Sequence, residues 1–384
     1  MDALELNDDQ RSIQDLVREF ARKEVAPGAR KRDETGEFPA DLIRRMAELN
    51  LLGIPVPEDL GGAGLDALSL VLTIEEIAKA CGSTALTLAA HTSLGTLPIL
   101  LFGDEAQKKS FIPPLARGER IGAYGLTEPG AGSDAGASQT TARRADGGYL
   151  LNGAKQFCTN ARHAGSYIVT AVTDRAQSKS RSISAFILER GFRGLRPGKT
   201  EDKLGMRASD TTELILEDVF VPEANRLGAE GEGFRMFMQI LDGGRIGIGA
   251  LALGLAEAAL ERSARYAQER RAFGKPIGGF QAIQFMLADM ATEIEAARHL
   301  IYHTARLKDL GRPFSREASM AKLFASEMAM RVTRNAIQVL GGNGYMAEYE
   351  VERLYRDAKL CEIGEGTSEV QRIVIARQMV GKLE

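Results

Sequence analysis

The chain contains no tryptophan and only three cysteines among its 384 residues. The cysteines, Cys81, Cys158 and Cys361, are odd in number and far apart in the sequence. This spacing excludes a disulfide framework and a cysteine-based zinc site as organising features of the fold. Free thiols of this kind are typical of a reducing compartment.

Histidine is also scarce, with four in the chain. Glu295, His299 and His303 recur at helical spacing, which could place them on one helix face. The HExxH order of zinc proteases is absent, however, and no third ligand accompanies the two histidines. We therefore interpret them as a solvated helix face and predict no metal site.

Positive charge is not in excess either. Lys and Arg total 49 against 52 Asp and Glu, so the net charge is −3, which excludes a broad nucleic-acid-binding face. No apolar run reaches the roughly 20 residues of a membrane helix, and the acidic start MDALELNDDQ resembles neither a secretory signal nor a transit peptide. We expect a cytoplasmic protein without a membrane span, or a mitochondrial matrix protein if the sequence is a processed eukaryotic form.

The length and a hydrophobic content of 44% predict two or three ordinary globular domains. Helical periodicity dominates the first third of the chain, beginning with a cap at Asn7 or Asp8. The expected helices there start at Pro39 (ending near Gly53) and cover 66–80, 84–101 and 104–117. Short β-like runs follow at 139–144, 149–151, 167–172, 183–188 and 211–221, and long helical patterns at about 233–270, 278–310, 315–340 and 367–382.

These patterns predict an α+β multidomain fold in three parts. We assign an N-terminal α-helical domain to residues 1–120, a middle β-barrel (or sandwich) to 121–225, and a C-terminal four-helix-bundle-like domain to 226–384.

The stretch IGEGTSEVQR (363–372) places Glu365 between two glycines at a predicted helix start. Glycine lets a ligand approach the backbone closely, and Ser368 with Gln371 fits a capping box. The N–H groups of Thr367, Ser368 and Glu369 would then form an anion site at the helix N-terminus. A surface helix with an exposed glutamate is the alternative for this stretch alone.

The stretch YGLTEPGAGSDAGA (124–137) contains a GxGxxA pattern, but β-like sequence follows it where a dinucleotide fold needs a helix. We therefore interpret it as a Gly-rich loop leaving a strand, able to donate to a ring carbonyl or a phosphate, or else a plain turn. QVLGGNGY (338–345) permits close contact with a ligand or subunit, or is a simple helix C-cap. ERRAFGKPI (269–277) offers arginines for a pyrophosphate, or is a charged helix end.

Taken together, these stretches resemble the acyl-CoA dehydrogenase family, towards its short- and branched-chain, butyryl-CoA dehydrogenase-like members. The resemblance covers essentially the whole chain and is carried by GLTEPGAGSDAGA (125–137), KLGMRASDTTEL (203–214), QVLGGNGYMAEYEVERLYRD (338–357) and EGTSEVQR (365–372). It implies a flavoenzyme, usually a homotetramer, with FAD between the middle domain and the C-terminal bundle.

By position, the resemblance implies three groups of FAD contacts. The first two come from the middle domain: Tyr124, Leu126, Thr127, Gly132 and Ser133, then Phe157, Cys158 and Thr159. The third comes from the helical domain, in part from a neighbouring subunit: Arg270, Phe273, Gln281, Gln338, Val339, Gly341, Gly342, Thr367, Ser368 and Glu369.

Glu365 matches the family's general base, and Ser133, Asp242, Arg245, Gly364 and Gly366 match its substrate contacts. The implied reaction is dehydrogenation of a saturated acyl-CoA thioester to a trans-2-enoyl-CoA, with proton removal by Glu365 and hydride transfer to flavin N5. An electron-transfer flavoprotein would then accept the electrons. A carrier-protein-linked dehydrogenase, an oxygen-using oxidase and a non-catalytic flavin- or acyl-CoA-binding relative remain alternatives.

Two positions depart from the family's common residues, and a third lies where members of the family differ. Phe157 stands where tryptophan is common, and the aromatic face is retained. Gly244 occupies the position where some relatives carry the base, so Glu365 has no competitor. Gly364 replaces a common tyrosine beside the base, which predicts a wider pocket for branched or cyclic acyl groups.

Overall fold

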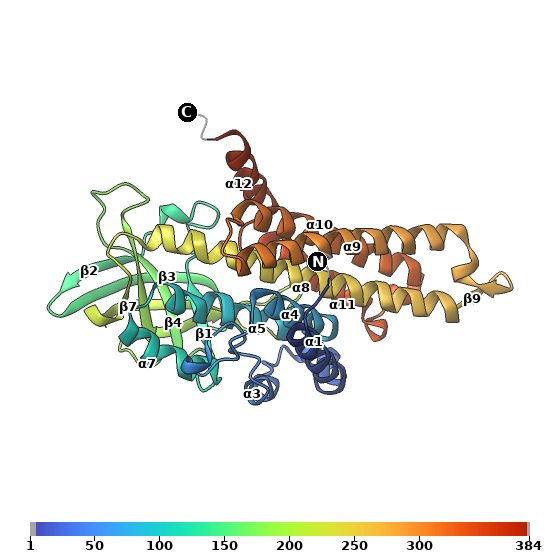
Figure 1. Cartoon of the computed structure of the whole chain (residues 1–384), viewed down its shortest axis with the longest axis horizontal. Helices are drawn as coiled ribbons and strands as arrows, with labels where there is room; N and C mark the ends of the chain where they lie inside the picture. The colour runs from blue at the N-terminus through green and yellow to red at the C-terminus, as the bar shows by residue number, and fades with distance from the viewer. Residues whose placement is uncertain (1–4, 382–384) are drawn as a thin grey trace.

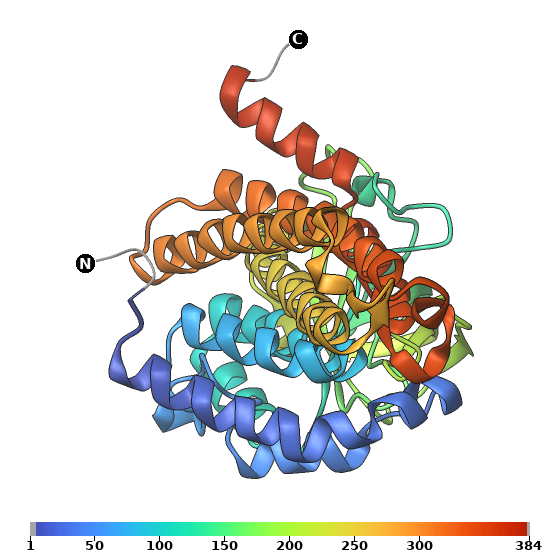
Figure 2. The same ribbon diagram turned by 90° about the vertical axis from the view of Figure 1, so that its right-hand side faces the viewer.

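The structure is a computed structural model that describes residues 5–381. The molecule is elongated, with the strands gathered at one end and long helices extending to the opposite end (Figure 1). The N-terminal helices lie along one side of the long helices, and the C-terminal helix α12 (Ser368–Val380) projects from the other side (Figure 2).

Helices fill the first part of the described chain, as predicted. Asn7 caps the first of them through a capping box with Gln10, and Asp104 forms the same arrangement with Gln107. Pro39 opens the third helix, which ends at Glu48, earlier than expected. The α-helices are α1 (Asp8–Phe20), α2 (Ala29–Thr35), α3 (Ala40–Glu48), α4 (Ala67–Ala80), α5 (Gly82–Ala89), α6 (Leu97–Phe102) and α7 (Glu105–Ala116).

The single helix expected over residues 84–101 is interrupted by a π-helical turn, Ala90–Thr96, between α5 and α6. Pro98, at the start of α6, has no N–H to donate to the carbonyl of Leu94, so one α-helical bond is missing just after this turn. Gly95 in this turn lies against Gly122, since a Cβ on Gly95 would stand 2.5 Å from the Gly122 Cα. The interruption thus packs the helical domain directly onto the first strand.

The middle of the chain forms one sheet of eight strands in the order β6-β7-β3-β2-β4-β5-β8, with β1 paired in parallel to β4. Within the described residues the end strands β6 and β8 do not pair with each other, so the predicted sheet domain is present but a closed barrel is not seen. The strands are β1 (Gly122–Gly125), β2 (Thr141–Ala145), β3 (Gly148–Thr159), β4 (Ser166–Val172), β5 (Ile183–Glu189), β6 (Leu195–Thr200), β7 (Thr211–Pro222) and β8 (Arg226–Leu227). The sequence patterns missed β6 and β8, because β8 has two residues and β6 (LRPGKT) contains proline and glycine.

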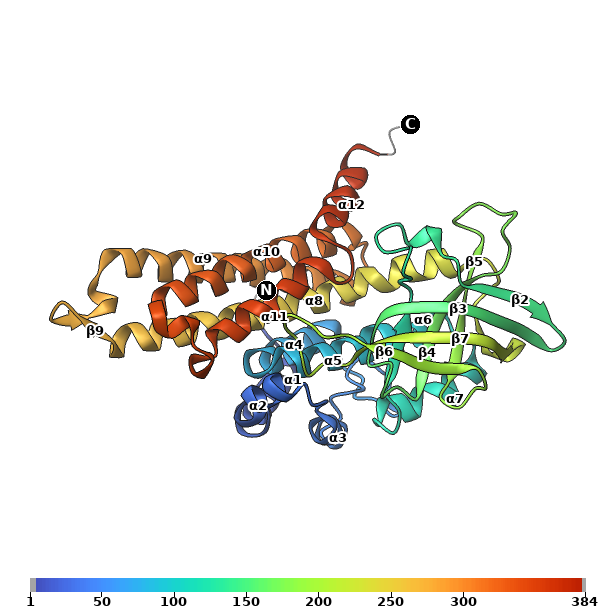
Figure 3. The same ribbon diagram turned by 180° about the vertical axis from the view of Figure 1, so that it is seen from behind.

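Long helices return after the sheet, as predicted. They are α8 (Gly233–Glu269), α9 (Gln281–Asp309), α10 (Ser315–Leu340), α11 (Val351–Ile363) and α12. A small hairpin, β9 (Arg271–Ala272) with β10 (Lys275–Pro276), joins α8 to α9 at the end of the molecule farthest from the sheet (Figure 3). Helix α11 was not predicted, although Val351, Leu354, Ala358 and Cys361 give it a buried face. The expected end of the last helix at residue 382 lies outside the described residues.

The largest hydrophobic core joins α1, α4 and α5 to α8, α9, α10 and α11. Two of its helical stretches, Gly82–Phe102 and Gly233–Glu269, are long and apolar enough to cross a membrane, with mean hydropathy 1.5 and 1.3 over 18 residues. No apolar run of this length was expected from the sequence. These stretches were missed because they mix apolar residues with glycine and threonine. Within the fold 78% and 89% of these windows are buried, as in the core helices of globular domains.

Candidate active site

Glu365 lies in the short turn between α11 and α12. Its φ of 53° is left-handed, and Gly366 follows with a φ of 95°. Thr367, not Ser368, is the N-cap of α12, with its side chain accepting from the Val370 N–H. The predicted capping box of Ser368 and Gln371 is therefore wrong, because Ser368 already belongs to the first turn of the helix.

Two buried side chains hold this turn. Gln371 Nε2 donates to the carbonyl oxygens of Glu365 at 3.2 Å and Gly366 at 2.9 Å. Lys322 Nζ, from α10, donates to the Gly366 carbonyl at 2.7 Å. Sequence reasoning missed the role of Gln371 and did not single out Lys322. The available signal was a lysine in phase with the alanines that face the core of α10, such as Ala318 and Ala325.

The carboxylate of Glu365 points into the protein. Its Oε2 is shielded from solvent and has no hydrogen-bond partner among the described residues. Burial raises the pKa of Glu365 to about 7, and the positive charges of Lys322 and Arg245 oppose that rise. A base with a pKa near neutrality is suited to proton removal at physiological pH.

Gly244 of α8 makes room for this carboxylate. A Cβ at position 244 would lie 1.8 Å from Glu365 Oε2 and 2.7 Å from its Cδ. A side chain at 244 and the present position of Glu365 are therefore incompatible. The two positions at which the family resemblance places the base meet at one point in space.

Arg245 and Asp242 form a partly buried pair beside Gly244. Arg245 Nη1 donates to Asp242 Oδ1 at 2.5 Å and to Ser319 Oγ at 3.2 Å, while its buried Nε has no partner among the described residues. Burial lowers the pKa of Arg245 and raises that of Asp242. Asp242 and Gly243 also line a cavity of about 960 Å³ between α6, α8 and the α9–α10 junction.

The Gly-rich loop predicted from YGLTEPGAGSDAGA leaves β1 as expected. Tyr124 is buried at its start, with a hydroxyl that has no partner within residues 5–381. Burial raises the pKa of Tyr124, and the charge of Glu365 adds to the rise, so the ring lies in the electrostatic field of the base. Leu126 and Thr127 are half-buried, whereas Gly132 and Ser133 are exposed.

An ion pair and a backbone hydrogen bond connect the Gly-rich loop to β3. Lys155 Nζ is 2.6 Å from Glu128 Oε1, and the two side chains are only 0% and 4% exposed. The Gln156 N–H also donates to the Thr127 carbonyl at 2.7 Å. Phe157, next along β3, has a φ of 56° and is 56% exposed. Cys158 faces the core, where burial raises its thiol pKa to about 12, and Thr159 is half-buried.

The remaining predicted cofactor contacts lie elsewhere in the chain. Arg270, Phe273 and Gln281 are exposed around the β9–β10 hairpin, at the opposite end of the molecule from the sheet (Figure 3). Gln338, Gly341 and Gly342 are exposed at the end of α10, and Val339 is buried. Asn343 Nδ2 donates to the Tyr266 hydroxyl of α8 at 2.9 Å, which places this end of α10 near the hairpin. We call these seven predicted residues the distal set.

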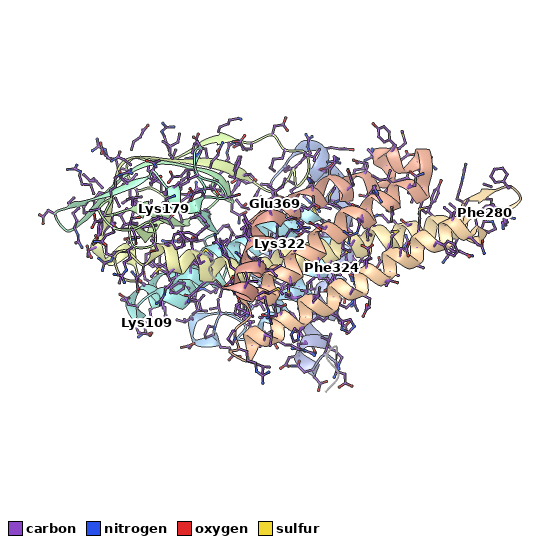
Figure 4. The ribbon with its side chains drawn as sticks, turned by 90° about the horizontal axis from the view of Figure 1, so that it is seen from above. Lys109, Lys179, Phe280, Lys322, Phe324 and Glu369 are labelled. Carbon is purple, nitrogen blue, oxygen red and sulfur yellow. The ribbon has the colours of Figure 1, made fainter. Side chains whose placement is uncertain are left out.

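Figure 4 makes the separation visible. Lys322 and Glu369 lie close together in the middle of the molecule, while Phe280, beside the hairpin, lies at the far end. One chain therefore brings together Glu365, Gly364, Gly366, Thr367, Ser368 and Glu369 with Gly244, Arg245, Asp242 and Tyr124. It does not bring the distal set to them.

The residues present fit an FAD. Phe157 offers an exposed aromatic face, and a Cβ at Gly130 or Gly132 would meet nothing within 4 Å. At the start of α12, the buried Ser368 Oγ has no partner among the described residues and adjoins the free N–H groups of the first turn. No group of three or more His, Cys, Asp or Glu in residues 5–381 is arranged to hold a metal ion.

Comparison with known proteins covers all three parts of the chain. Residues 7–119, 123–219 and 231–380 match the N-terminal, middle and C-terminal domains of acyl-CoA dehydrogenases. A probable acyl-CoA dehydrogenase of Bacillus subtilis is 54% identical over 98% of this chain and 99% of its own length.

Two solved structures are similar over nearly their whole length. Butyryl-CoA dehydrogenase of Megasphaera elsdenii is 47% identical with a TM-score of 0.97, covering 99% of this chain and 100% of its own. A chain from a structure described as the electron transferring flavoprotein of Acidaminococcus fermentans is 50% identical with a TM-score of 0.98, covering 100% of both chains.

FAD complexes occur among the structural neighbours, and the similar proteins are named acyl-CoA dehydrogenases, so the predicted flavin cofactor and enzyme class are confirmed. Three family domains in the expected order, a close relative over nearly the whole chain and a shared three-part fold all agree: the chain belongs to the acyl-CoA dehydrogenase family.

Proposed function

We propose that this protein dehydrogenates a short saturated acyl-CoA thioester between Cα and Cβ to the trans-2-enoyl-CoA, with Glu365 as the general base. The observation that carries the proposal is the shielded, unpartnered Glu365 carboxylate beside Arg245 and Lys322. A carboxylate so placed is free to take a proton from a substrate carbon.

The protein must also make the α-proton acidic enough to remove. The backbone N–H of Glu365 takes part in no hydrogen bond among the described residues, and we assign it to the thioester carbonyl. A donor in a water-poor site stabilises the negative charge that develops on that oxygen. The left-handed turn at Glu365 would direct the N–H and the carboxylate of one residue at neighbouring substrate atoms.

Bound FAD supplies the acceptor for the β-hydride. We assign its ring and phosphates to the loop 124–133, to Phe157, Cys158 and Thr159, and to the first turn of α12, with Thr367, Ser368 and Glu369. Because the distal set lies far from these residues in one chain, we assign it to the FAD of a neighbouring subunit (Figure 3). This assignment requires an oligomer, and we propose the homotetramer usual for the family.

The thiol-bearing arm of CoA would occupy the cavity of about 960 Å³ lined by Asp242, Gly243 and Ser315. Lys308, Arg312 and Arg316 also line this cavity, against the carboxylates of Asp242 and Glu317, so three positive charges face two negative ones and the lining would favour an anionic ligand. The cavity reaches Gly243, next to Gly244 and the base, so a thioester at its inner end would lie beside Glu365. Ser133, exposed on the Gly-rich loop, is the remaining predicted substrate contact.

Gly364 bears on the shape of the acyl group. Its φ of −65° suits any residue, and a Cβ there would meet only Leu360 atoms at 3.5 Å or more. Neither the backbone nor the packing requires glycine at this position, so its effect is the volume left open beside the base. We propose that branched or cyclic short acyl groups are accepted as well as straight ones.

The decisive experiment is an anaerobic titration of the flavin absorbance with a panel of straight, branched and cyclic acyl-CoAs. We expect bleaching by short-chain members, including branched ones. Gly364→Tyr should remove the response to branched substrates and retain that to a straight one. A yellow protein that no acyl-CoA bleaches would contradict the proposal and favour a carrier-protein thioester, and rapid reoxidation by dioxygen would favour an oxidase.

We further propose an electron-transfer flavoprotein as electron acceptor and a cytoplasmic location. The structural neighbour described as such a flavoprotein supports the first. We retain the domain limits 1–120, 121–225 and 226–384, with no nucleic-acid partner and no membrane span as expectations from the sequence.

A further inference from the structure

Lys322 is a lysine in the protein core. Lys322 is 0% exposed and lies on the face of α10 that carries Ala318, Ala325 and Ala329. A charged group is seldom fully buried without a partner charge, because desolvation of the ammonium is costly. The burial of this side chain therefore needs a structural or functional explanation.

The contacts of Lys322 are unusual for a buried lysine. Within residues 5–381 it forms no ion pair, and its hydrogen bond runs to a backbone oxygen, the Gly366 carbonyl at 2.7 Å. Lys155, also fully buried, pairs instead with the Glu128 carboxylate at 2.6 Å. The charge of Lys322 is thus left to act on groups that it does not contact directly.

We propose that Lys322 is a positioning residue for the reaction, which holds the Glu365–Gly366 turn through its bond to Gly366 and whose charge keeps Glu365 in its carboxylate form. The inference rests on Glu365 being the base, as proposed above.

The first part of this role concerns the backbone. Glu365 has a φ of 53°, a conformation that a non-glycine residue adopts only when its surroundings impose it. The Gly366 carbonyl accepts from both Lys322 and Gln371, and Gln371 also binds the Glu365 carbonyl. Two buried donors therefore fix the peptide groups on which the base is carried.

The second part concerns charge. The charged and titratable groups around the turn are Tyr124 of β1, Asp242 and Arg245 of α8, Lys322 of α10, Cys361 and Glu362 of α11, and Glu369 of α12. Burial raises the pKa of Glu365 to about 7, and Lys322 is the larger of the two cationic influences that oppose it. Burial lowers the pKa of Lys322 itself to about 8, so the lysine is largely charged at pH 7 and below, where Glu365 begins to lose its proton.

Lys322 and Gln371 allow geometry and charge to be separated. Lys322→Gln keeps a donor near Gly366 and removes the charge, whereas Gln371→Met removes a donor and leaves the charge. Lys322→Met removes both. Lys203→Met is the matched control, since Lys203 is a half-buried lysine whose Nζ also donates to a backbone carbonyl, that of Ser209 at 2.8 Å, and contacts none of the groups around the turn.

The experiment measures kcat/KM against pH for each FAD-loaded variant with one short acyl-CoA. Because kcat/KM reports the ionisation of the free enzyme, its acidic limb follows Glu365. We expect this limb to move up by about one pH unit in Lys322→Gln and Lys322→Met, a loss of roughly tenfold at pH 6 that shrinks towards pH 9. Gln371→Met should lower kcat at every pH without moving the limb.

A second readout does not depend on turnover. An infrared titration of the protonated carboxyl band, identified by its loss in Glu365→Gln, should show the same upward shift in both Lys322 variants. Lys203→Met should leave the limb and the band unchanged.

Two outcomes would overturn the inference. If the Lys322 variants lose activity equally at all pH values with the carboxyl band unmoved, the lysine is only structural. If they retain the wild-type profile, it has no role at the site. Failure of the proposed function is distinguishable, because Glu365→Gln would then keep its activity whatever the Lys322 variants do.

Discussion

At the scale of single residues, the left-handed conformation of Glu365 and the glycine opposite it, Gly244, together position the Glu365 carboxylate. A non-glycine residue in this region costs about 1–2 kcal/mol, and Glu365 has a φ of 53°. In return, its carboxylate enters the space that Gly244 leaves free. Strained backbone at a reacting residue is a common way to preorganise a site.

Replacement of Gly244 should therefore impair catalysis more than folding. A Cβ there would lie 1.8 Å from Glu365 Oε2, so Gly244→Ala must displace the base. We expect kcat to fall by about 10²-fold, as small misplacements of reacting groups do. Gly247→Ala on the same helix is the control, because its Cβ would meet the nearest atom at 3.5 Å. Equal activities of the two variants would contradict the crowding argument.

Glu365→Gln should separate activity from stability. Loss of the base should lower kcat by about 10²–10⁴-fold while FAD content is retained. The folded-state pKa is about 7, above the ordinary value of 4.5, so the folded protein binds this proton more tightly than the unfolded chain does. The carboxylate therefore destabilises the fold as pH rises from about 4.5 to about 7, by at most about 3 kcal/mol.

Glutamine avoids that penalty, so urea unfolding should show the variant gaining stability over the wild type at pH 8 and matching it at pH 4. A variant less stable than the wild type at pH 8 would show that the carboxylate is well solvated.

At the scale of elements, the Gly-rich loop depends on a buried ion pair with β3. Glu128 accepts hydrogen bonds from the Gln139 N–H at 2.6 Å and the Thr140 N–H at 3.1 Å, in addition to pairing with Lys155. One carboxylate thus ties the end of the loop to the sheet. The same loop also carries an exposed pair, Lys179 with Asp134 at 3.1 Å, in which both side chains are 67% exposed.

Removal of Lys155 from the buried pair should lower the free energy of unfolding far more than removal of Lys179 from the exposed pair. Lys155→Met leaves Glu128 charged, buried and unpaired, which costs about 3–5 kcal/mol of unfolding free energy. The double change Lys155→Met with Glu128→Gln should recover most of this loss. Lys179→Met should change stability by less than about 1 kcal/mol. Urea unfolding of the four proteins measures these differences, and equal losses in the single and double variants would show that the buried charge is not the cause.

At the scale of the whole molecule, the two surfaces that we propose contact FAD lie at opposite ends of one chain. The Gly-rich loop belongs to the sheet end, and the hairpin that carries Phe273 belongs to the other end (Figure 1). Phe273 is 96% exposed and Tyr345, near the end of α10, is 80% exposed. Large apolar side chains so exposed are typical of surfaces that another molecule covers.

Phe273→Asp should therefore weaken assembly and cofactor binding together. We expect smaller particles in light scattering and a lower ratio of flavin to protein absorbance, with an unchanged helical circular dichroism spectrum. Phe220→Asp is the control, because Phe220 is 45% exposed on β7, in the sheet. Full FAD content in a dissociated Phe273→Asp protein would contradict the assignment of the distal set to a neighbouring subunit.

Much of the element order followed from local patterns. The cap at Asn7 was read from residues adjacent in the chain, and so was the helical periodicity of α8, α9 and α10, because both depend only on short-range geometry. The patterns failed where neighbours in space decided the outcome. The π-helical turn at Ala90–Thr96 packs on β1, where Gly95 lies against Gly122, and Lys322 of α10 holds the Glu365–Gly366 turn that precedes α12.

The sequence by itself determined the family, the α, β, α order and Glu365 as the candidate base, since motif order and helix periodicity are properties of the chain. Only the tertiary structure decided that Gly244 faces Glu365 and that Lys322 of α10 reaches Gly366. It also decided that the distal set lies far from the Gly-rich loop. These are distances between residues widely separated in the chain, and packing sets them, because each side chain occupies the space that its distant neighbours leave.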